Sequence, residues 1–251
     1  MSSVTLDHPQ DARPAQWDVQ ALNQRLKHHG AQDVLRAALD VEPRLALVSS
    51  FGAESVVLLH LAAMVTRDLP VLFIDTQMLF TETLVYQMEL CERLRLRDVR
   101  TIRAADTEVT HHDPDGRLHQ RDTDACCDLR KTRPLQKALA PFGGWITGRK
   151  RYQSGTRAAL AFFEDDSATG RLKVNPLARW RPEDVQDYMT ENRLPRHPLV
   201  AQGYPSIGCA PCTSPVAPGE DPRSGRWRGQ SKEECGIHFE NGKMVRTGVS
   251  K

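Results

Sequence analysis

The sequence predicts an α/β fold built on a doubly wound, mainly parallel sheet. Short apolar segments of strand length alternate with longer segments whose apolar residues recur at helical spacing. This alternation is typical of parallel strands joined by crossover helices. A chain of 251 residues is long enough to bury the core of one large domain of this kind. The expected strands are residues 44–49, 70–75, 99–102, 144–148 and 172–176.

The segments between these strands predict helices and one long irregular stretch. Residues 17–39 carry apolar side chains at helical spacing, and Gly30 divides them into two helices. Residues 111–122 are rich in turn-forming residues and predict a solvated loop, because the spacing of their histidines and aspartates fits no metal-ligand pattern. Further helices are expected at residues 56–64, 82–96, 124–133 and 182–192.

Composition divides the chain into three parts. Residues 1–16 are polar and have no apolar period, which predicts a disordered lead-in. Residues 17–205 form the expected α/β domain. Regular patterning fades from Pro195 onward, so residues 206–251 form a separate C-terminal segment that ends in a flexible tail.

The charge and the cysteine content restrict the class of protein. The net charge is +2 with 26% charged residues, so neither nucleic acid nor a membrane surface is expected as a partner. No apolar run approaches the roughly twenty residues of a membrane span. Few cysteines and no secretory leader favour the cytoplasm. A homo-oligomer is the default expectation, because symmetric oligomers are common.

Candidate ligand-binding residues follow the expected strands, where open α/β sheets bind their ligands. Residues 50–55 form a turn that can present backbone N–H groups to a phosphate, although an ordinary capped turn is the commoner explanation. Asp75 and Thr76 follow the second strand, where Asp75 is either a ligand-binding group or a turn aspartate. Residues 149–151 and Arg157 concentrate positive charge after a later strand, which favours binding of an anion.

Four of the six cysteines form two pairs. Cys126 and Cys127 are adjacent, and Cys209 and Cys212 follow much later in the chain. Disulfides require tight geometry and an oxidising compartment, and a single zinc ion requires four thiolates at one tetrahedral point. A cubane iron–sulfur cluster instead offers a separate iron to each thiolate. An iron–sulfur cluster therefore ranks first, zinc second and disulfides third.

The two remaining cysteines lie in different settings. Cys91 lies between leucines in an expected helix and is interpreted as a small core residue. Cys235 lies in a polar, glycine-flanked tail, which favours a reactive nucleophile over an incidental exposed cysteine. Lys131 emerges on a helix face close to the first cysteine pair, and Arg223 and Arg226 make the segment before Cys235 basic.

Taken together, these motifs resemble those of the assimilatory adenylyl-sulfate reductases, the cluster-bearing branch of the sulfonucleotide reductase family. The resemblance covers roughly residues 44–240. Its most specific element is the combination of the two cysteine pairs with Glu-Cys-Gly-Ile-His at residues 234–238. It also rests on Ser50–Ser55, Phe73–Thr76, Arg130–Lys131, Trp145–Ser154, Arg223 and Arg226.

The resemblance implies an adenine nucleotide α-hydrolase-like fold, in which residues 17–205 bind the nucleotide. It implies reduction of adenylyl sulfate to sulfite and AMP in sulfate assimilation and cysteine biosynthesis, with Cys235 as the catalytic nucleophile, an S-sulfocysteine intermediate and thioredoxin as the electron donor. One [4Fe–4S] cluster is implied on Cys126, Cys127, Cys209 and Cys212. The pattern and the resemblance together give the expected substrate-binding residues, which are Ser50, Phe51, Gly52, Glu54, Ser55, Asp75, Thr76, Lys131, Arg149, Arg151, Arg223 and Arg226.

Two positions depart from the family pattern, and three alternative functions stay open. Gln77 stands where the family often has glycine, so a turn with positive φ is costlier here, and Tyr152 stands where aspartate is frequent. A reductase for the 3′-phosphorylated substrate is less favoured because all four cluster cysteines are present. An ATP pyrophosphatase that thiolates RNA would have different residues at Phe51 and Glu54. A non-catalytic cluster-carrying protein would not require Cys235.

Overall fold

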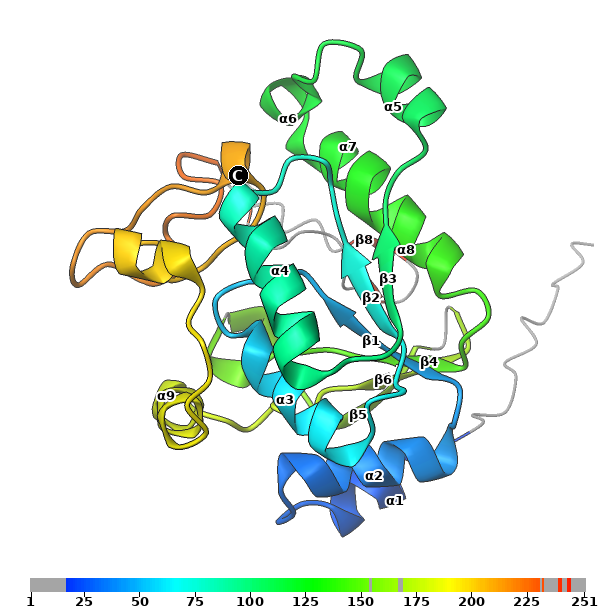
Figure 1. Cartoon of the computed structure of the whole chain (residues 1–251). Helices are drawn as coiled ribbons and strands as arrows, with labels where there is room; N and C mark the ends of the chain where they lie inside the picture. The colour runs from blue at the N-terminus through cyan, green and yellow to red at the C-terminus, as the bar shows by residue number, and fades with distance from the viewer. Residues whose placement is uncertain are drawn as a thin grey trace, which may run out of the picture.

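The computed structural model describes residues 17–153, 155–166, 169–230, 232, 239–240 and 243–244. The predicted lead-in at residues 1–16 and the predicted nucleophile Cys235 lie outside the described residues. The described part contains a six-stranded sheet in the order β3-β2-β1-β4-β6-β5 (Figure 1). Its strands are β1 Leu45–Ser49, β2 Val71–Ile74, β3 Val99–Ile102, β4 Gly144–Ile146, β5 Phe163–Asp166 and β6 Arg171–Val174, and β7 Phe239–Glu240 pairs separately with β8 Lys243–Met244.

The strand order reverses beside β1. From β1 the chain adds β2 and then β3 on one side, and β4 later returns to pair with the other side of β1. These pairings are parallel, as is β4 with β6, whereas β5 is an antiparallel edge strand. The predicted doubly wound, mainly parallel sheet is therefore confirmed. Ligands of such sheets bind at the carboxyl ends of the strands where the order reverses.

Successive side chains of the central strands point to opposite faces of the sheet, and both faces are covered by helices. Leu47, Phe73 and Ile146 belong to a large buried cluster, while Ala46 and Trp145 belong to a smaller cluster on the other face. The large cluster includes residues of α1 Val19–Arg25, α2 Ala31–Val41, α3 Ser55–Val65, α4 Thr81–Leu94 and α9 Pro182–Glu191, and the smaller one includes residues of α8 Arg133–Ala138.

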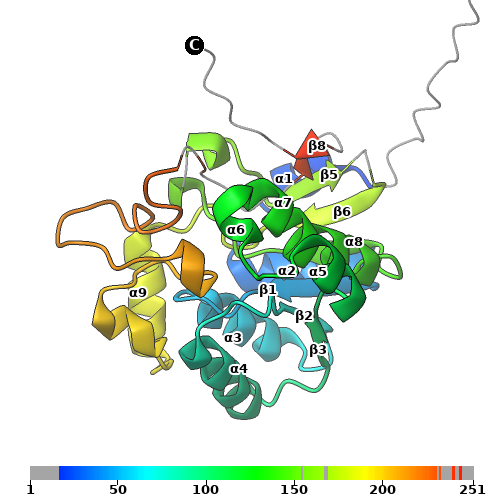
Figure 2. The same cartoon turned by 90° about the horizontal axis from the view of Figure 1, so that it is seen from above.

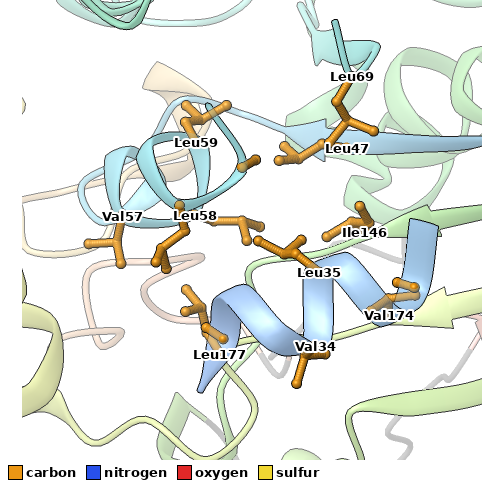
Figure 3. Packing of buried hydrophobic residues seen from close by; sticks show 14 of the residues in the cluster. Val34, Leu35, Leu47, Val57, Leu58, Leu59, Leu69, Ile146, Val174 and Leu177 are labelled. Carbon is orange, nitrogen blue, oxygen red and sulfur yellow. The ribbon is translucent and has the colours of Figure 1, made fainter. Parts of the chain in front are cut away.

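The packing on the larger face is a direct contact of helices with the sheet. Figure 3 shows Leu35 of α2 and Leu58 of α3 in the same apolar cluster as Ile146 and Val174 of the sheet. Figures 1 and 2 show α3 and α4 on the side of the sheet opposite to α8. None of the helices in the described part is long and apolar enough to cross a bilayer.

The two predicted N-terminal helices are confirmed by their caps. The Asp18 side chain accepts a hydrogen bond from the Ala21 backbone N–H at 2.9 Å and begins α1. Gly30 is the N-cap of α2, so this glycine separates the two helices as expected.

The prediction of a solvated loop at residues 111–122 is only partly correct, because most of the stretch is exposed but half of it is helical. Two short helices, α5 Asp106–His112 and α6 Leu118–Arg121, supply six of its twelve residues. Between them Asp113 is buried, accepts a hydrogen bond from the Leu118 N–H at 2.7 Å, and forms an ion pair with Arg130 at 2.8 Å. This partner lies distant in sequence, so the local pattern of turn-forming residues gave no sign of it.

Two other expectations about secondary structure need correction. The expected helix 124–133 consists of α7 Thr123–Cys127, a π-helical turn at Asp128–Thr132, and α8. The strand β5 was missed because its sequence Phe-Glu-Asp-Asp is acidic and has no apolar alternation. This segment forms a strand because it pairs with β6, although its own sequence does not predict a strand.

Candidate active site

A cavity of about 290 Å³ opens at the carboxyl ends of β1 and β4, where the strand order reverses. Its wall combines apolar side chains, which suit an aromatic ring, with cations that suit an anion. The apolar lining residues include Leu47, Val48, Leu58, Ile74 and Trp145, and the charged ones are Glu54, Arg149, Lys150, Arg157, Asp221, Arg223 and Arg226.

The turn after β1 contributes four of its predicted residues to the cavity lining, namely Ser50, Gly52, Glu54 and Ser55. Phe51 differs, because its side chain is fully buried and its ring packs edge-on against Phe73 with the centroids 5.2 Å apart. The φ angle of Phe51 is +50°, in the left-handed region that glycine adopts most easily. The structure therefore places Phe51 in the core, where it supports the turn without lining the cavity.

The Glu54 carboxylate is the centre of a polar cluster in the cavity wall. It accepts hydrogen bonds from Lys150 Nζ at 2.8 Å, from the Tyr152 hydroxyl at 3.0 Å and from Gln153 Nε2 at 3.4 Å. Burial lowers the pKa of Lys150, and the charge of Glu54 opposes this shift. Burial and then the charge of Glu54 raise the pKa of Tyr152, so its hydroxyl stays a hydrogen-bond donor at neutral pH.

The basic run after β4 sends its side chains in different directions. Arg149 lines the cavity, is buried and forms an ion pair with Glu164. Arg151, by contrast, lies outside the lining, is exposed, and donates from Nε to the Leu160 carbonyl at 2.8 Å. The structure therefore does not bring Arg151 together with the other predicted substrate-binding residues.

Lys150 and Arg157 line the cavity. Both belong to the basic cluster that was predicted to hold an anion, but neither was among the expected substrate-binding residues. The feature of the sequence that pointed to these two cations was the cluster of basic residues after β4. A 3₁₀ turn at Arg151–Gln153 interrupts this run directly after Lys150. Residue types alone did not reveal which side chains would point inward.

The C-terminal segment contributes Arg223 and Arg226 to the cavity. Arg226 Nη1 donates to the Ile207 carbonyl at 3.3 Å, and its guanidinium carbon lies 4.5 Å from the centroid of the Trp227 ring. A Cβ atom at Gly208 would lie 2.3 Å from Arg226 Nη2. Glycine at this position therefore leaves the space that the guanidinium group occupies.

Asp75 and Thr76 lie outside the cavity lining and organise the loop after β2. Asp75 is buried, pairs with Arg103 at 2.7 Å, and accepts a hydrogen bond from the Gln77 N–H at 2.8 Å. It therefore acts as a turn aspartate, which was the alternative to ligand binding. Gln77 has a φ angle of +60°, so a side chain occupies the strained conformation for which the family often uses glycine. The Thr76 hydroxyl lies 3.2 Å from Cys209 Sγ.

The two cysteine pairs lie in one region of the fold. All four are free thiols, and Cys126, Cys127 and Cys209 are buried. Burial, followed by the charges of the other three cysteines, raises the pKa of Cys126 to about 12. Burial and Cys209 raise the pKa of Cys212 to about 11, while Lys131 and Arg226 oppose this shift. The pairs are therefore close enough to influence one another's ionisation.

The fold explains how the pairs meet. The first pair lies at the end of α7, and the buried Lys131 follows in the π-helical turn. The second pair is held beside the loop after β2, because Ala210 N donates to the Met78 carbonyl at 2.8 Å. Lys131 belongs to this cysteine region and is not part of the cavity lining.

Within the part of the chain that the structure describes, no three His, Cys, Asp or Glu side chains converge on the position of a single metal ion. A cubane cluster does not require such convergence, because each thiolate binds a different iron. The four buried or half-buried thiols thus fit a cubane cluster in residue type and in grouping. The predicted nucleophile Cys235 lies outside the described residues and is not placed relative to them.

Comparison with known proteins gives consistent results. Residues 44–215 match the model of the phosphoadenosine phosphosulfate reductase domain. The chain is 53% identical over 195 residues to an adenosine 5′-phosphosulfate reductase from Mesorhizobium japonicum, covering 78% of this chain and 76% of the relative. It is 45% identical over 233 residues to the protein of the same name from Chelativorans sp., covering 90% and 94%. The crystal structure of phosphoadenylyl-sulfate (PAPS) reductase from Candida auris, in complex with phosphate, matches with a TM-score of 0.67 and 27% identity, covering 86% of this chain and all of that chain.

The family match spans most of the α/β fold, from the residue before β1 to the second cysteine pair and beyond. The relatives extend the similarity over at least three quarters of each sequence. The chain therefore belongs to the phosphoadenosine phosphosulfate reductase domain family, and the sulfonucleotide reductase resemblance that its motifs indicated is confirmed.

Proposed function

We propose that the protein reduces adenylyl sulfate to sulfite and AMP in sulfate assimilation. The observation that carries this proposal is the cavity at the β1–β4 reversal, in which apolar and cationic side chains share one wall. An adenine ring suits the apolar part, and the phosphosulfate group suits the arginines, which bind phosphate and sulfate oxygens bidentately. The names of the two bacterial relatives favour the substrate without a 3′-phosphate.

We assign Cys126, Cys127, Cys209 and Cys212 as the ligands of one [4Fe–4S] cluster. Their grouping in one region and the unsuitability of adjacent cysteines for a single tetrahedral ion support this assignment. When bound, the cluster supplies an electrostatic and structural element beside the substrate and does not carry electrons. Lys131 is buried in the cysteine region, so its ammonium group is suited to link that region electrostatically to an anionic substrate.

The first chemical step is nucleophilic attack by the Cys235 thiolate on the sulfur atom of adenylyl sulfate. The bond between sulfur and the bridging phosphate oxygen breaks, AMP leaves with the electron pair, and Cys235 becomes S-sulfocysteine. Two anions must approach each other, so cations are required around the reacting atoms. Arg223 and Arg226 lie in the cavity wall and precede Cys235 in the chain, which suits them to this role. Their charge also favours the thiolate form of Cys235.

The second step requires a dithiol protein, for which we propose thioredoxin. Its thiolate attacks Sγ of Cys235, sulfite leaves, and a mixed disulfide forms. The second thiol of the partner resolves the mixed disulfide and restores the Cys235 thiolate. The two electrons gained by the substrate sulfur therefore come from the oxidation of two partner thiols to a disulfide.

The remaining expectations follow from this assignment. We propose residues 17–205 as the nucleotide-binding domain and residues 206–251 as a segment that brings the second cysteine pair and the catalytic cysteine to it. Reduced thiols and a thioredoxin donor fit the cytoplasm. A homo-oligomer is proposed on general grounds.

Steady-state assays with two nucleotides test the proposal. The anaerobically purified protein, supplied with thioredoxin and thioredoxin reductase, is expected to produce equal amounts of sulfite and AMP from adenylyl sulfate. Cys235→Ser is expected to abolish both products while the iron content is unchanged. Faster turnover of the 3′-phosphorylated nucleotide, which the name of the Candida auris protein makes the main alternative, would reassign the substrate. Inactivity with both nucleotides would refute the proposal.

A further inference from the structure

We propose that Asp113 is a positioning residue of the cysteine region, because it holds the Arg130 guanidinium group that orders the loop after β2 beside Cys209. The inference rests on the proposed function in one respect, which is the assignment of the four cysteines as cluster ligands. Asp113 belongs to the stretch 111–122, to which the sequence assigned no chemical role.

Asp113 carries a carboxylate that the fold has removed from water. Its side chain is 0% exposed, and its Oδ2 lies 2.8 Å from Nη2 of Arg130, whose side chain is 6% exposed. Its other oxygen, Oδ1, accepts the hydrogen bond from the Leu118 N–H. The Arg121 guanidinium group lies further from Oδ1, at 3.9 Å, and is 51% exposed. Burial of a charge is costly unless a partner compensates it, so Asp113 and Arg130 fix each other's position.

Arg130 connects Asp113 to the loop after β2. Its Nη1 donates to the Thr76 carbonyl at 3.0 Å and to the Gln77 side-chain oxygen at 3.4 Å. The Gln77 side chain in turn donates from Nε2 to Asp106 Oδ1 at 3.2 Å, in the first turn of α5. The guanidinium group is therefore held on one side by Asp113 and holds the backbone of the loop on the other.

The loop after β2 places a hydrogen-bond donor at the second cysteine pair. The Thr76 hydroxyl accepts a hydrogen bond from the Met78 N–H at 3.3 Å and lies 3.2 Å from Cys209 Sγ. A cysteine that binds iron is a thiolate, which only accepts hydrogen bonds, so the hydroxyl group is the donor in the cluster-loaded protein. A continuous series of contacts thus runs from Asp113 to Cys209.

Arg130 also acts on the first cysteine pair. It lies in the π-helical turn that directly follows Cys127. Burial and the neighbouring thiols raise the pKa of Cys126, and the charge of Arg130 opposes this rise, so the guanidinium group lies near that sulfur atom. Arg130 Nε is buried and has no hydrogen-bond partner within the described ranges. A buried N–H of this kind suits a thiolate or sulfide acceptor, which agrees with the assignment of the cysteines to a cluster.

The positioning role should be visible in how firmly the protein retains iron. Four thiolates around one cluster give the cysteine region a net negative charge, and a buried anion depends on nearby cations and hydrogen-bond donors. Removing a group that supports the ligands of a metal typically lowers the metal affinity roughly ten- to a hundred-fold. Asp113 anchors such a group and does not itself touch a cysteine, so the lower end of this range applies.

The rate of iron loss to an excess of an iron chelator tests the inference in the full-length, anaerobically purified, cluster-loaded protein. The visible absorbance of the cluster is followed over time. Asp113→Asn, which keeps an oxygen for the Leu118 N–H, is expected to lose iron about ten-fold faster than the wild type. Thr76→Val, which lacks the hydroxyl group, should also lose iron about ten-fold faster, whereas Thr76→Ser should keep the wild-type rate.

A double variant separates positioning from the stability of a buried ion pair. Asp113→Asn leaves the Arg130 charge buried without compensation, and Asp113→Asn combined with Arg130→Met removes that charge. The double variant is therefore expected to resist urea better than Asp113→Asn but to lose iron as fast, because no group then holds the Thr76 carbonyl. Asp115→Asn removes an exposed ion pair in the same segment and should lose iron at the wild-type rate. The affinity for AMP should be unchanged in Asp113→Asn, since Asp113 lies outside the cavity lining.

The outcomes separate the inference from the proposed function. A wild-type protein without iron–sulfur absorbance after anaerobic purification would overturn the cluster assignment, and the inference would fall with it. A wild type that holds its cluster, together with a wild-type rate of iron loss in Asp113→Asn, would refute the positioning role alone. Return to the wild-type rate in the double variant would show that the ion pair only stabilises the fold, which also contradicts the inference. If Asp113→Asn does not fold, equal rates in Thr76→Val and Thr76→Ser decide against it.

Discussion

Replacing Glu54 with glutamine is expected to destabilise the fold by about 3 kcal/mol. The Lys150 side chain is 3% exposed, and its ammonium group donates to the Glu54 carboxylate at 2.8 Å. Removal of one partner from a buried ion pair costs about 3–5 kcal/mol, because the other charge stays buried without compensation. The Glu54 side chain is 27% exposed, so water compensates in part and the lower end of this range applies.

The stability lost in Glu54→Gln should decrease as the pH rises. Burial already holds the pKa of Lys150 below its ordinary value of 10.5, and the Glu54 charge limits the shift. Loss of that charge lowers the folded-state pKa further, so the folded state binds fewer protons than the unfolded state. Stability then rises with pH, and the difference between Glu54→Gln and the wild type should be smaller at pH 9 than at pH 7.

Urea unfolding at the two pH values measures these differences, and two matched variants separate their causes. Tyr152→Phe removes one hydrogen bond to the same carboxylate from a ring that is 40% exposed, so it should cost only about 1 kcal/mol at either pH. Glu54→Gln combined with Lys150→Met removes both charges and should be more stable than Glu54→Gln alone. A loss below about 0.5 kcal/mol in Glu54→Gln, or no recovery in the double variant, would refute the reasoning.

Three further predictions concern other parts of the fold. In Gly144→Ala the new Cβ would lie 2.3 Å from the Leu172 carbonyl oxygen of the neighbouring strand, so urea unfolding should show a loss of about 3 kcal/mol or more. Burial lowers the pKa of His197 to about 4, so the unfolded state takes up the proton first and stability should fall by about 3 kcal/mol between pH 6.5 and 4; His197→Gln should flatten this slope. Arg226→Ala should weaken AMP binding in calorimetry roughly ten-fold, whereas Arg151→Ala, which lies outside the cavity lining, should change it less than about two-fold.

The sequence predicted the parts of the fold whose order is encoded locally. Continuous apolar strands and small-residue turns identified β1, β2 and β4, and the helical spacing around Gly30 identified α1 and α2. The stretch around Asp113 could not be predicted, because its order depends on an ion pair with a residue from another segment. Strand β5 is ordered by its neighbour, so its acidic sequence carried no signal.

In the candidate site, too, features encoded by the local sequence were predicted, and features that depend on the exact backbone path or on distant partners were not. The position of the turn at residues 50–55 followed from the strand before it, and four of its five predicted residues line the cavity, with Phe51 as the exception. The cavity is lined by Lys150 and not by the predicted Arg151. Which of the two side chains points inward depends on the backbone at the 3₁₀ turn Arg151–Gln153, which residue types do not determine. Asp75 was ambiguous because turn aspartates and ligand-binding aspartates occupy the same position after a strand. Its partner Arg103 resolves the ambiguity.

The central claim is that Cys235 takes the sulfo group from adenylyl sulfate before any thiol partner acts. The most direct measurement is the mass of the anaerobically purified, cluster-loaded protein after incubation with adenylyl sulfate in the absence of thioredoxin. We expect one SO₃ unit on the peptide that contains Cys235, with one AMP released for each adduct, and no adduct on Cys235→Ser. An intact, cluster-loaded protein that stays unmodified with both adenylyl sulfate and its 3′-phosphorylated form would contradict the account.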